Sequence, residues 1–265
     1  MSAQAKTIPA GRFSAPLPLI VNASAPSPIV LVCEHASSFI PPELNDLGLA
    51  ANQLQGHWAW DPGALGVAET MSTNLDAVLV AAQVSRMVYD CNRPPQAKDA
   101  IVVAGEDFQI PGNLGLTGLQ RQDRIELVYE PFKAALENII QTHHSTPVIV
   151  TIHSFTRVYH GKQREVEIGI LHDVDDRLAN AMLSCADEYT DLLVQRNEPY
   201  GPQHGVTHTL RKHALPGGFP NVMIEIRNDL IATEAAQKAM GETLANWVNS
   251  CLDASGMPMS EGKSS

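Results

Sequence analysis

Two histidines stand beside apolar, β-branched stretches of the sequence, where an imidazole can serve as a metal ligand. His35 comes two residues after the stretch 29–33 (IVLVC), and His153 comes directly after 147–152 (PVIVTI). If both stretches are parallel strands, their carboxyl ends lie at the edge of the sheet where ligands bind. Two imidazoles and one carboxylate form a three-ligand zinc site with an open position. An open position suits a hydrolase, because zinc lowers the pKa of its bound water toward ~7.

The third ligand of such a site has two candidates in the sequence. Asp61, in the segment 57–64 (HWAWDPGA), is the first choice. Asp followed by Pro also fits a helix N-cap, and the two interpretations are compatible. Glu34 is the alternative, but neighbouring side chains on a strand point to opposite faces, which makes shared ligation with His35 awkward.

A buried acid is expected at Glu225, which lies inside the apolar stretch 221–226 (NVMIEI). A carboxylate there is costly unless it is paired or functional. It either pairs with Arg227, two residues further on, or acts as a general base that takes a proton from the attacking water. We favour the general base.

A neutral amide and a cation, Asn92 and Arg93, follow the stretch 86–90 (RMVYD). The planar guanidinium of Arg grips a carboxylate with two parallel hydrogen bonds, so a substrate with a free carboxylate would match. Arg86 and Arg227 are second candidates for this role. The alternatives are structural: Asp90 pairs with Arg86 or with Arg93.

The elements that must position these residues alternate along the chain. Strands are predicted at 29–33, 77–82, 86–90, 147–152, 166–171 and 221–226. Helices are predicted at 63–74, 120–142, 177–195 and 233–252. This alternation predicts an α/β fold with a mixed or mainly parallel sheet that helices cover on both faces. Five of the strands, including 166–171 with His172-Asp173 after it, would then deliver polar side chains to one edge.

One domain accounts for most of the chain. Residues 1–27 are rich in Ala, Ser and Pro, and we expect an irregular arm with one short strand at 19–21. Residues 28–252 contain no linker-like segment and are expected to form a single domain. Residues 253–265 are expected to be a flexible tail.

The composition narrows the choice of partners. A net charge of −11 disfavours nucleic acid and anionic membrane surfaces. No apolar run reaches the ~18 residues of a membrane span, and we see no signal peptide. The four cysteines are far apart and form no CxxC pair, which indicates a reducing, cytoplasmic setting. The sequence leaves open whether the chain forms a homo-oligomer.

Several of these segments, taken in order, resemble the N-formylglutamate amidohydrolase family. They are 33–37 (CEHAS) with Pro41, 61–64 (DPGA), 85–94 (SRMVYDCNRP), 152–155 (IHSF) and 225–230 (EIRNDL). Each motif is short, but together they span about residues 30–231, and their order and spacing are specific.

The resemblance implies a distant relationship to zinc carboxypeptidases and aspartoacylase-type deacylases. It implies a mixed sheet of roughly eight strands between helices. Those relatives carry, in chain order, a metal histidine, an Asn-Arg pair that binds the substrate carboxylate, a second metal histidine and a late catalytic Glu. His35, Asn92-Arg93, His153 and Glu225 stand in that order here. The relatives often carry Glu three residues after the first histidine, where this chain has Ser38.

The sequence thus predicts a hydrolase that uses one zinc ion per chain, held by His35, Asp61 and His153, to cleave the amide of N-formylglutamate or a related N-acyl amino acid. Iron, cobalt or manganese would suit the same ligands. Two alternatives are a metallo-carboxypeptidase acting on short peptides and a non-catalytic carboxylate-binding protein.

Overall fold

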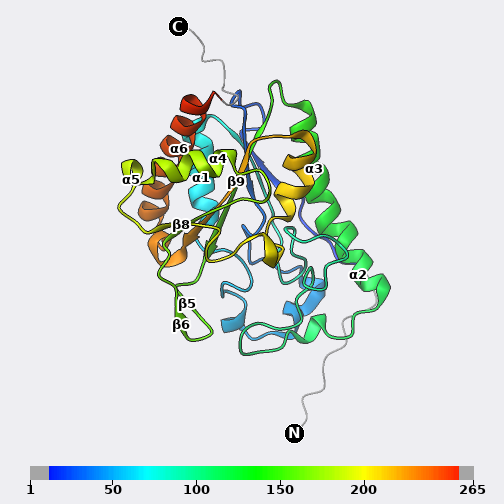
Figure 1. Ribbon diagram of the computed structural model, residues 1–265. Coiled ribbons are helices and arrows are strands. Elements are labelled where there is room, and N and C mark those ends of the chain that lie inside the picture. The colour runs from blue at the N-terminus through cyan, green and yellow to red at the C-terminus, as the bar shows by residue number, and fades with distance from the viewer. Residues whose placement is uncertain (1–11, 257–265) are drawn as a thin grey trace.

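A seven-stranded mixed sheet forms the centre of the computed structural model, which describes residues 12–256 (Figure 1). The strand order is β1-β3-β2-β4-β9-β7-β8. These strands are β1 (Leu19–Val21), β2 (Ile29–Cys33), β3 (Val78–Ala81), β4 (Val148–Phe155), β7 (Ile168–Leu171), β8 (Val194–Arg196) and β9 (Asn221–Arg227). The prediction of a single α/β domain with a mostly parallel, mixed sheet is confirmed, with seven strands where the resemblance implied roughly eight.

Four central strands, β3, β2, β4 and β9, run parallel to one another. The edge strand β1, which the sequence predicted, is antiparallel to β3. On the other side β7 is antiparallel to β9, and β8 is parallel to β7. The carboxyl ends of β7 and β8 therefore lie at the opposite edge of the sheet from those of the central strands.

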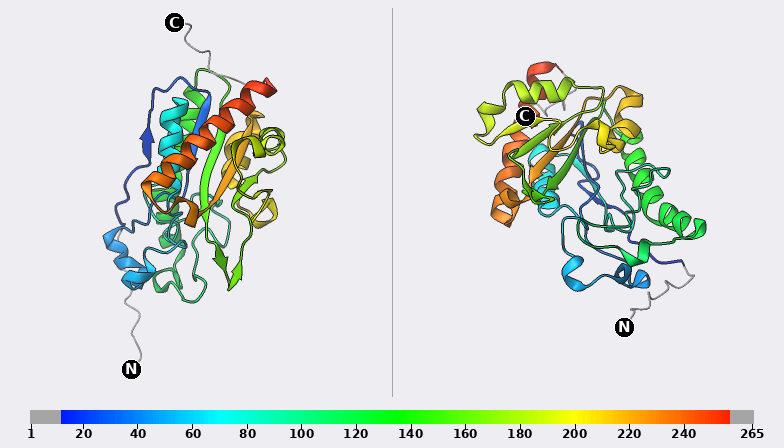
Figure 2. Two further views of the ribbon diagram at one scale, coloured as in Figure 1. Left: turned by 90° about the vertical axis from the view of Figure 1, so that its left-hand side faces the viewer. Right: turned by 60° about the horizontal axis from the view of Figure 1, so that its bottom comes forward.

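Helices cover both faces of the sheet (Figures 1 and 2). They are α1 (Ala64–Leu75), α2 (Gly118–Arg124), α3 (Glu130–Thr142), α4 (Arg177–Ser184), α5 (Ala186–Tyr189) and α6 (Glu234–Ser255). In Figure 1, α1, α4 and α6 lie on one side of the sheet, and α2 and α3 lie on the other. None of the helices within residues 12–256 is both long and apolar enough to cross a lipid bilayer.

The alternation of side chains along a strand supplies both layers of the core. From β2, the side chains of Ile29, Leu31 and Cys33 pack in the layer with α1, α4 and α6. Val30 and Val32 pack in the layer that contains α3. Because both faces are covered, β2 is apolar throughout.

The predicted helix 120–142 is present and longer than expected. It begins after Thr117, whose hydroxyl accepts a hydrogen bond from the backbone N–H of Gln120, as a helix N-cap does. Between α2 and α3 the chain continues through a π-helical turn, η4 (Ile125–Tyr129).

Two element predictions are wrong. Residues 86–90 form a turn, because the Ser85 carbonyl accepts from the Val88 N–H (2.9 Å) and the Ser85 hydroxyl accepts from the Met87 N–H (3.2 Å). The predicted helix 177–195 ends at Tyr189, after a break between α4 and α5, and the chain then enters the short, largely exposed strand β8. A small hairpin of β5 (Val158–Tyr159) and β6 (Lys162–Gln163) was not predicted.

The strand order predicts a ligand site beside β2. The chain adds β3 to one side of β2 and β4 to the other, so the direction of strand addition reverses at this point. In open α/β sheets, ligands bind beyond the carboxyl ends of the strands at such a reversal. The segment after β2 carries His35, and the end of β4 carries His153.

Candidate functional site

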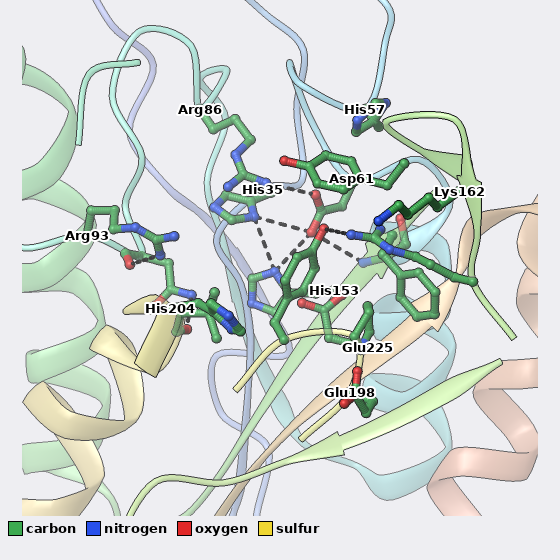
Figure 3. A pocket seen from close by; sticks show the side chains of 18 residues that line it. His35, His57, Asp61, Arg86, Arg93, His153, Lys162, Glu198, His204 and Glu225 are labelled. Atoms are coloured by element: carbon green, nitrogen blue, oxygen red, sulfur yellow. Dashed lines mark hydrogen bonds and ion pairs between the residues drawn. The ribbon is translucent and has the colours of Figure 1, made fainter. Parts of the chain in front are cut away.

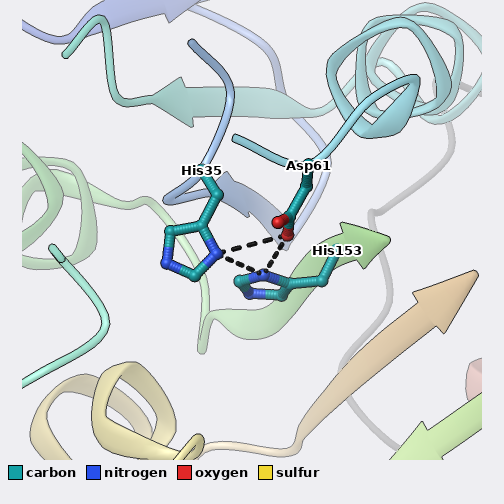
Figure 4. Close-up of side chains that lie close together, drawn as sticks. All are labelled: His35, Asp61 and His153. Carbon is teal, nitrogen blue, oxygen red and sulfur yellow. Dashed lines mark hydrogen bonds and ion pairs between the residues drawn. The ribbon is translucent and has the colours of Figure 1, made fainter. Parts of the chain in front are cut away.

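Three buried side chains converge at this point (Figure 4). Oδ2 of Asp61 lies 3.2 Å from Nδ1 of His35 and 2.9 Å from Nδ1 of His153. The two Nδ1 atoms are 3.2 Å apart. Each of the three residues is at most 3% exposed, so all three donor atoms face one another in the interior.

These separations fit a tetrahedral metal ion. With zinc bonds of 2.0–2.1 Å, neighbouring ligand atoms of a tetrahedron lie about 3.3 Å apart. The three donor atoms are separated by 2.9 to 3.2 Å. Two imidazoles and one carboxylate are also a donor set that zinc uses in catalytic sites. The residues therefore fit a divalent metal with one position left for water or substrate.

Backbone groups of two other segments hold Asp61 in place. Its N–H donates to the His35 carbonyl (2.9 Å), and its Oδ2 accepts from the Ser154 N–H (3.3 Å). Helix α1 begins at Ala64 with Gly63 at its N-cap. The N-cap interpretation of Asp61 is therefore wrong, and its carboxylate faces the two histidines instead.

A second set of carboxylates contacts the far nitrogens of both imidazoles. Nε2 of His35 lies 2.7 Å from Oδ1 of Asp90. Nε2 of His153 lies 3.1 Å from Oε2 of Glu34, an ion-pair distance without the direction of a hydrogen bond. A carboxylate behind a histidine fixes the ring and its tautomer in metal sites. Glu34 therefore lies behind His153, outside the group of three donor atoms.

Negative charge is in excess around the two imidazoles. Glu34, Asp61 and Asp90 are each at most 2% exposed, and the nearest guanidinium is that of Arg86. Arg86 donates to Asp90 Oδ2 (2.9 Å) and to Asp61 Oδ1 (3.4 Å). Burial alone would lower the pKa of His153, but Glu34 and Asp61 outweigh it and raise that pKa well above its usual value. A bound divalent cation would offset the same negative charge.

Glu225 lies on β9 directly beside His153 on β4 in the strand register. It is 5% exposed, and its Oε2 has no hydrogen-bond partner within residues 12–256. Burial raises the pKa of Glu225 to about 7. A carboxyl group with that pKa can both accept and return a proton near neutral pH.

A cavity of about 640 Å³ opens above these residues (Figure 3). Its lining includes the three donor residues and Glu225. The remaining charged or polar side chains of the lining are His57, Arg86, Asn92, Arg93, Ser154, Tyr159, Lys162, Arg164, Glu198, Tyr200 and His204. Basic groups outnumber acidic ones on the walls, so the cavity suits an anionic ligand.

Arg93 and Asn92 both reach the cavity but differ in the freedom of their side chains. Arg93 donates from Nε to Asp99 (2.7 Å) and from Nη1 to the Gly205 carbonyl (3.0 Å). Its Nη2 has no hydrogen-bond partner among the described residues. The amide of Asn92 donates to the Val206 carbonyl and accepts from the Thr209 N–H, so it holds the neighbouring loop.

Arg227 and the pair His172-Asp173 do not join the site. The guanidinium of Arg227 pairs with Asp229 (2.8 Å) and Glu167 (3.2 Å) instead of Glu225, and Arg227 is absent from the cavity lining. His172-Asp173 follow β7, whose carboxyl end points away from the site because β7 is antiparallel to β9.

The sequence interpretation missed two contributors to the site. It gave Asp90 a structural role, whereas Asp90 lies against His35. It did not single out Arg164, which precedes β7 and lines the cavity. The reversed direction of β7 brings its start, rather than its end, to the site, and the residues alone carry no signal for that reversal.

This chain resembles one protein family and several solved structures. The model of the N-formylglutamate amidohydrolase family matches residues 27–232. The crystal structure of gene product Atu2144 from Agrobacterium tumefaciens has 49% identity and a TM-score of 0.88, over 94% of this chain and 99% of that one. An N-formylglutamate amidohydrolase from Ralstonia eutropha JMP134 has 20% identity and a TM-score of 0.62, over 87% of this chain and 94% of that one.

A metallo-carboxypeptidase from Burkholderia cenocepacia has 10% identity and a TM-score of 0.36, over 89% of this chain and 66% of that one. None of the curated proteins matches this chain.

Proposed function

Because the chain belongs to the N-formylglutamate amidohydrolase family, we propose that it hydrolyses the amide of N-formylglutamate or a closely related N-acyl amino acid with the help of one zinc ion. The observation that carries the zinc dependence is the convergence of His35 Nδ1, His153 Nδ1 and Asp61 Oδ2 at the floor of a basic cavity. Glu225 beside them supplies the proton transfer that amide hydrolysis needs.

His35, Asp61 and His153 would hold the metal ion. A divalent ion bound there polarises a carbonyl group and lowers the pKa of a water molecule toward ~7. Asp90 and Glu34 would keep each imidazole oriented with its Nδ1 toward the ion.

Glu225 would act as the general base and then as the general acid. Its carboxylate takes a proton from the attacking water and returns a proton to the leaving nitrogen as the C–N bond breaks. This gives formate and the free amino group when the acyl group is formyl. Oε2 of Glu225 has no hydrogen-bond partner among the described residues and can therefore take up the proton. Because the residue is buried, that proton would not be lost to bulk solvent.

Two arginines would contact the substrate. Nη2 of Arg93 is free to take one oxygen of the α-carboxylate, and Asn92 holds the loop beside it. Arg86, held by Asp61 and Asp90, lines the cavity and would stabilise negative charge on the amide oxygen.

The test is release of formate from N-formyl-L-glutamate by the zinc-loaded protein. We expect Glu225→Gln to keep its zinc and to lower kcat by at least ~100-fold, because only the proton transfer is removed. An unchanged kcat would exclude Glu225 from the mechanism.

Dipeptides and N-acetyl-glutamate, assayed beside the formyl substrate, separate the proposal from its alternatives. Preferential cleavage of dipeptides would instead assign a carboxypeptidase. Wild-type protein that hydrolyses none of these compounds would contradict the proposed function.

A further inference from the structure

The basic groups of the cavity lie on two opposite sides of the metal-site residues. Figure 3 places Arg93 on one side of His35, Asp61 and His153, and Lys162 on the other. Lys162 belongs to the hairpin strand β6, and Arg164 follows it two residues later in the cavity wall. The proposed function uses Arg93 for the α-carboxylate and leaves the wall with Lys162 and Arg164 unassigned.

Aromatic rings and neutral oxygens hold the guanidinium of Arg164. Its central carbon lies 4.5 Å from the ring centroid of Tyr159, 4.9 Å from that of Tyr200 and 5.5 Å from that of Phe155. Nη2 donates to the Tyr200 hydroxyl (2.9 Å), and Nη1 donates to the Thr156 carbonyl (3.2 Å). Stacking and hydrogen bonds fix its planar fork before any ligand arrives, which reduces the entropy lost on binding.

Backbone geometry brings Tyr200 to this position. The segment that carries Glu198 packs against the face of β7 at Gly169, where an added Cβ would lie 1.9 Å from the Glu198 carbonyl oxygen. Only glycine allows that approach, so Gly169 lets the segment that leads to Tyr200 pass close to β7.

Among the described residues, Arg164 differs from the other arginines around the site in having no acidic partner. Arg86 pairs with Asp61 and Asp90, Arg93 pairs with Asp99, and Arg227 pairs with Asp229 and Glu167. Within residues 12–256 neither Arg164 nor Lys162 forms an ion pair. Glu198 also lines the cavity, but it lies beyond ion-pair distance of both. Among the described residues, no carboxylate forms an ion pair with the positive charge of this wall.

We infer that Arg164, supported by Lys162, binds the side-chain carboxylate of the substrate and makes the enzyme specific for N-acyl amino acids with an acidic side chain. The inference rests on the proposed function, since it assumes that the substrate's amide lies over the metal-site residues. A substrate with two carboxylates then places one toward Arg93 and the other toward Arg164. Arg164 is a specificity residue and takes no part in bond cleavage.

The test compares two ligands that have nearly the same shape, N-formyl-L-glutamate and N-formyl-L-glutamine. Their dissociation constants are measured by calorimetry with zinc-loaded Glu225→Gln protein, which binds without turnover. Arg164→Gln in this background should weaken binding of the glutamate compound by roughly 10- to 100-fold, the range for a hydrogen bond to a charged group. Binding of the glutamine compound should change by less than about 3-fold.

Arg211→Gln is the matched control, because Arg211 is 65% exposed and does not line the cavity. It removes the same charge and should leave both dissociation constants unchanged. Lys162→Gln, on an exposed hairpin strand, tests the same wall if Arg164→Gln does not fold. It should also weaken the binding of N-formyl-L-glutamate more than that of N-formyl-L-glutamine.

The outcomes separate the inference from the proposed function. The role of Arg164 is overturned if Arg164→Gln weakens the binding of both ligands equally or weakens the binding of neither. It is also overturned if N-formyl-L-glutamate does not bind at all. Selective weakening in a protein whose wild type hydrolyses neither compound supports the role of Arg164 and overturns the proposed activity instead.

Discussion

At the scale of single residues, each histidine of the candidate metal site lies between two carboxylates. Asp61 faces both Nδ1 atoms, while Asp90 lies behind His35 and Glu34 lies behind His153. The hydrogen bond of Nε2 of His35 to Asp90 favours the proton on that nitrogen and leaves Nδ1 with a free lone pair for a metal ion. The site therefore depends on residues that would not touch the metal.

Asp90→Asn tests that dependence. The substitution keeps the shape of the side chain but removes the charge behind His35 and the ion pair with Arg86. We expect zinc affinity to fall by roughly 10- to 100-fold, as measured by competition with a chelator. Asp99→Asn, which removes a 56% exposed carboxylate outside this group, should leave the affinity unchanged. Equal affinities of Asp90→Asn and wild type would show that Asp90 does not support the ligand.

The pH dependence of the reaction should report the ionisation of Glu225. Burial raises its pKa to about 7, and a nearby metal cation would lower it again, so the acidic limb should lie at or below that pH. A general base acts in its ionised form. The ratio kcat/KM should therefore fall as the pH is lowered through this pKa and stay level above it. The residual activity of Glu225→Gln should lack the limb, and an unchanged limb in that variant would assign the titration to another group.

That His35, His153, Asp61 and Glu225 lie close together could be predicted, because each stands in or beside a buried strand or in a recognisable motif. The choice between Asp61 and Glu34 could not be made from spacing, since it depends on which imidazole nitrogen each carboxylate faces. Arg227 was also expected near these residues, but it lies outside the cavity. The same strand carries it, yet acidic residues beyond the strand, Glu167 and Asp229, bind its guanidinium.

At the scale of elements, the direction of each strand decides which residues meet. The apolar stretches predicted the central strands and their cover of helices, but not that β7 runs against β9. That reversal removes His172-Asp173 from the site and brings Arg164 to it. The turn at residues 86–90 could not be predicted either, because its apolar side chains are buried as they would be in a strand.

The contact between α1 and α6 gives a prediction at this scale. An added Cβ at Gly241 on α6 would lie 2.6 Å from Thr70 Cβ and 2.9 Å from the Val67 carbonyl on α1. Gly241→Val should force the helices apart and lower the free energy of unfolding by about 1–3 kcal/mol. The measurement is urea denaturation. Lys238→Ala, at a 72% exposed position of α6, should change it by less than about 0.5 kcal/mol. Equal stability of Gly241→Val and wild type would contradict the close packing.

At the scale of the whole molecule, an acidic protein encloses a basic cavity. The net charge is −11, yet four of the residues that line the cavity are Arg86, Arg93, Lys162 and Arg164. The charge close to a site, rather than the net charge of the protein, decides which ligands it attracts, and these four groups favour an anionic one. The cytoplasmic location and the domain limits at residues 28 and 252 stay predictions from the sequence.

The central claim is that His35, Asp61 and His153 hold one metal ion, and metal content tests it most directly. Wild type and the variants His35→Ala, Asp61→Ala and His153→Ala are purified without added metal and analysed by elemental mass spectrometry. His57→Ala is the control, because His57 lines the same cavity but stands outside the group of three. We expect about one zinc per chain in wild type and in His57→Ala, and little in the other three variants. Metal-free wild type, or metal retained in all three variants, would contradict the assignment.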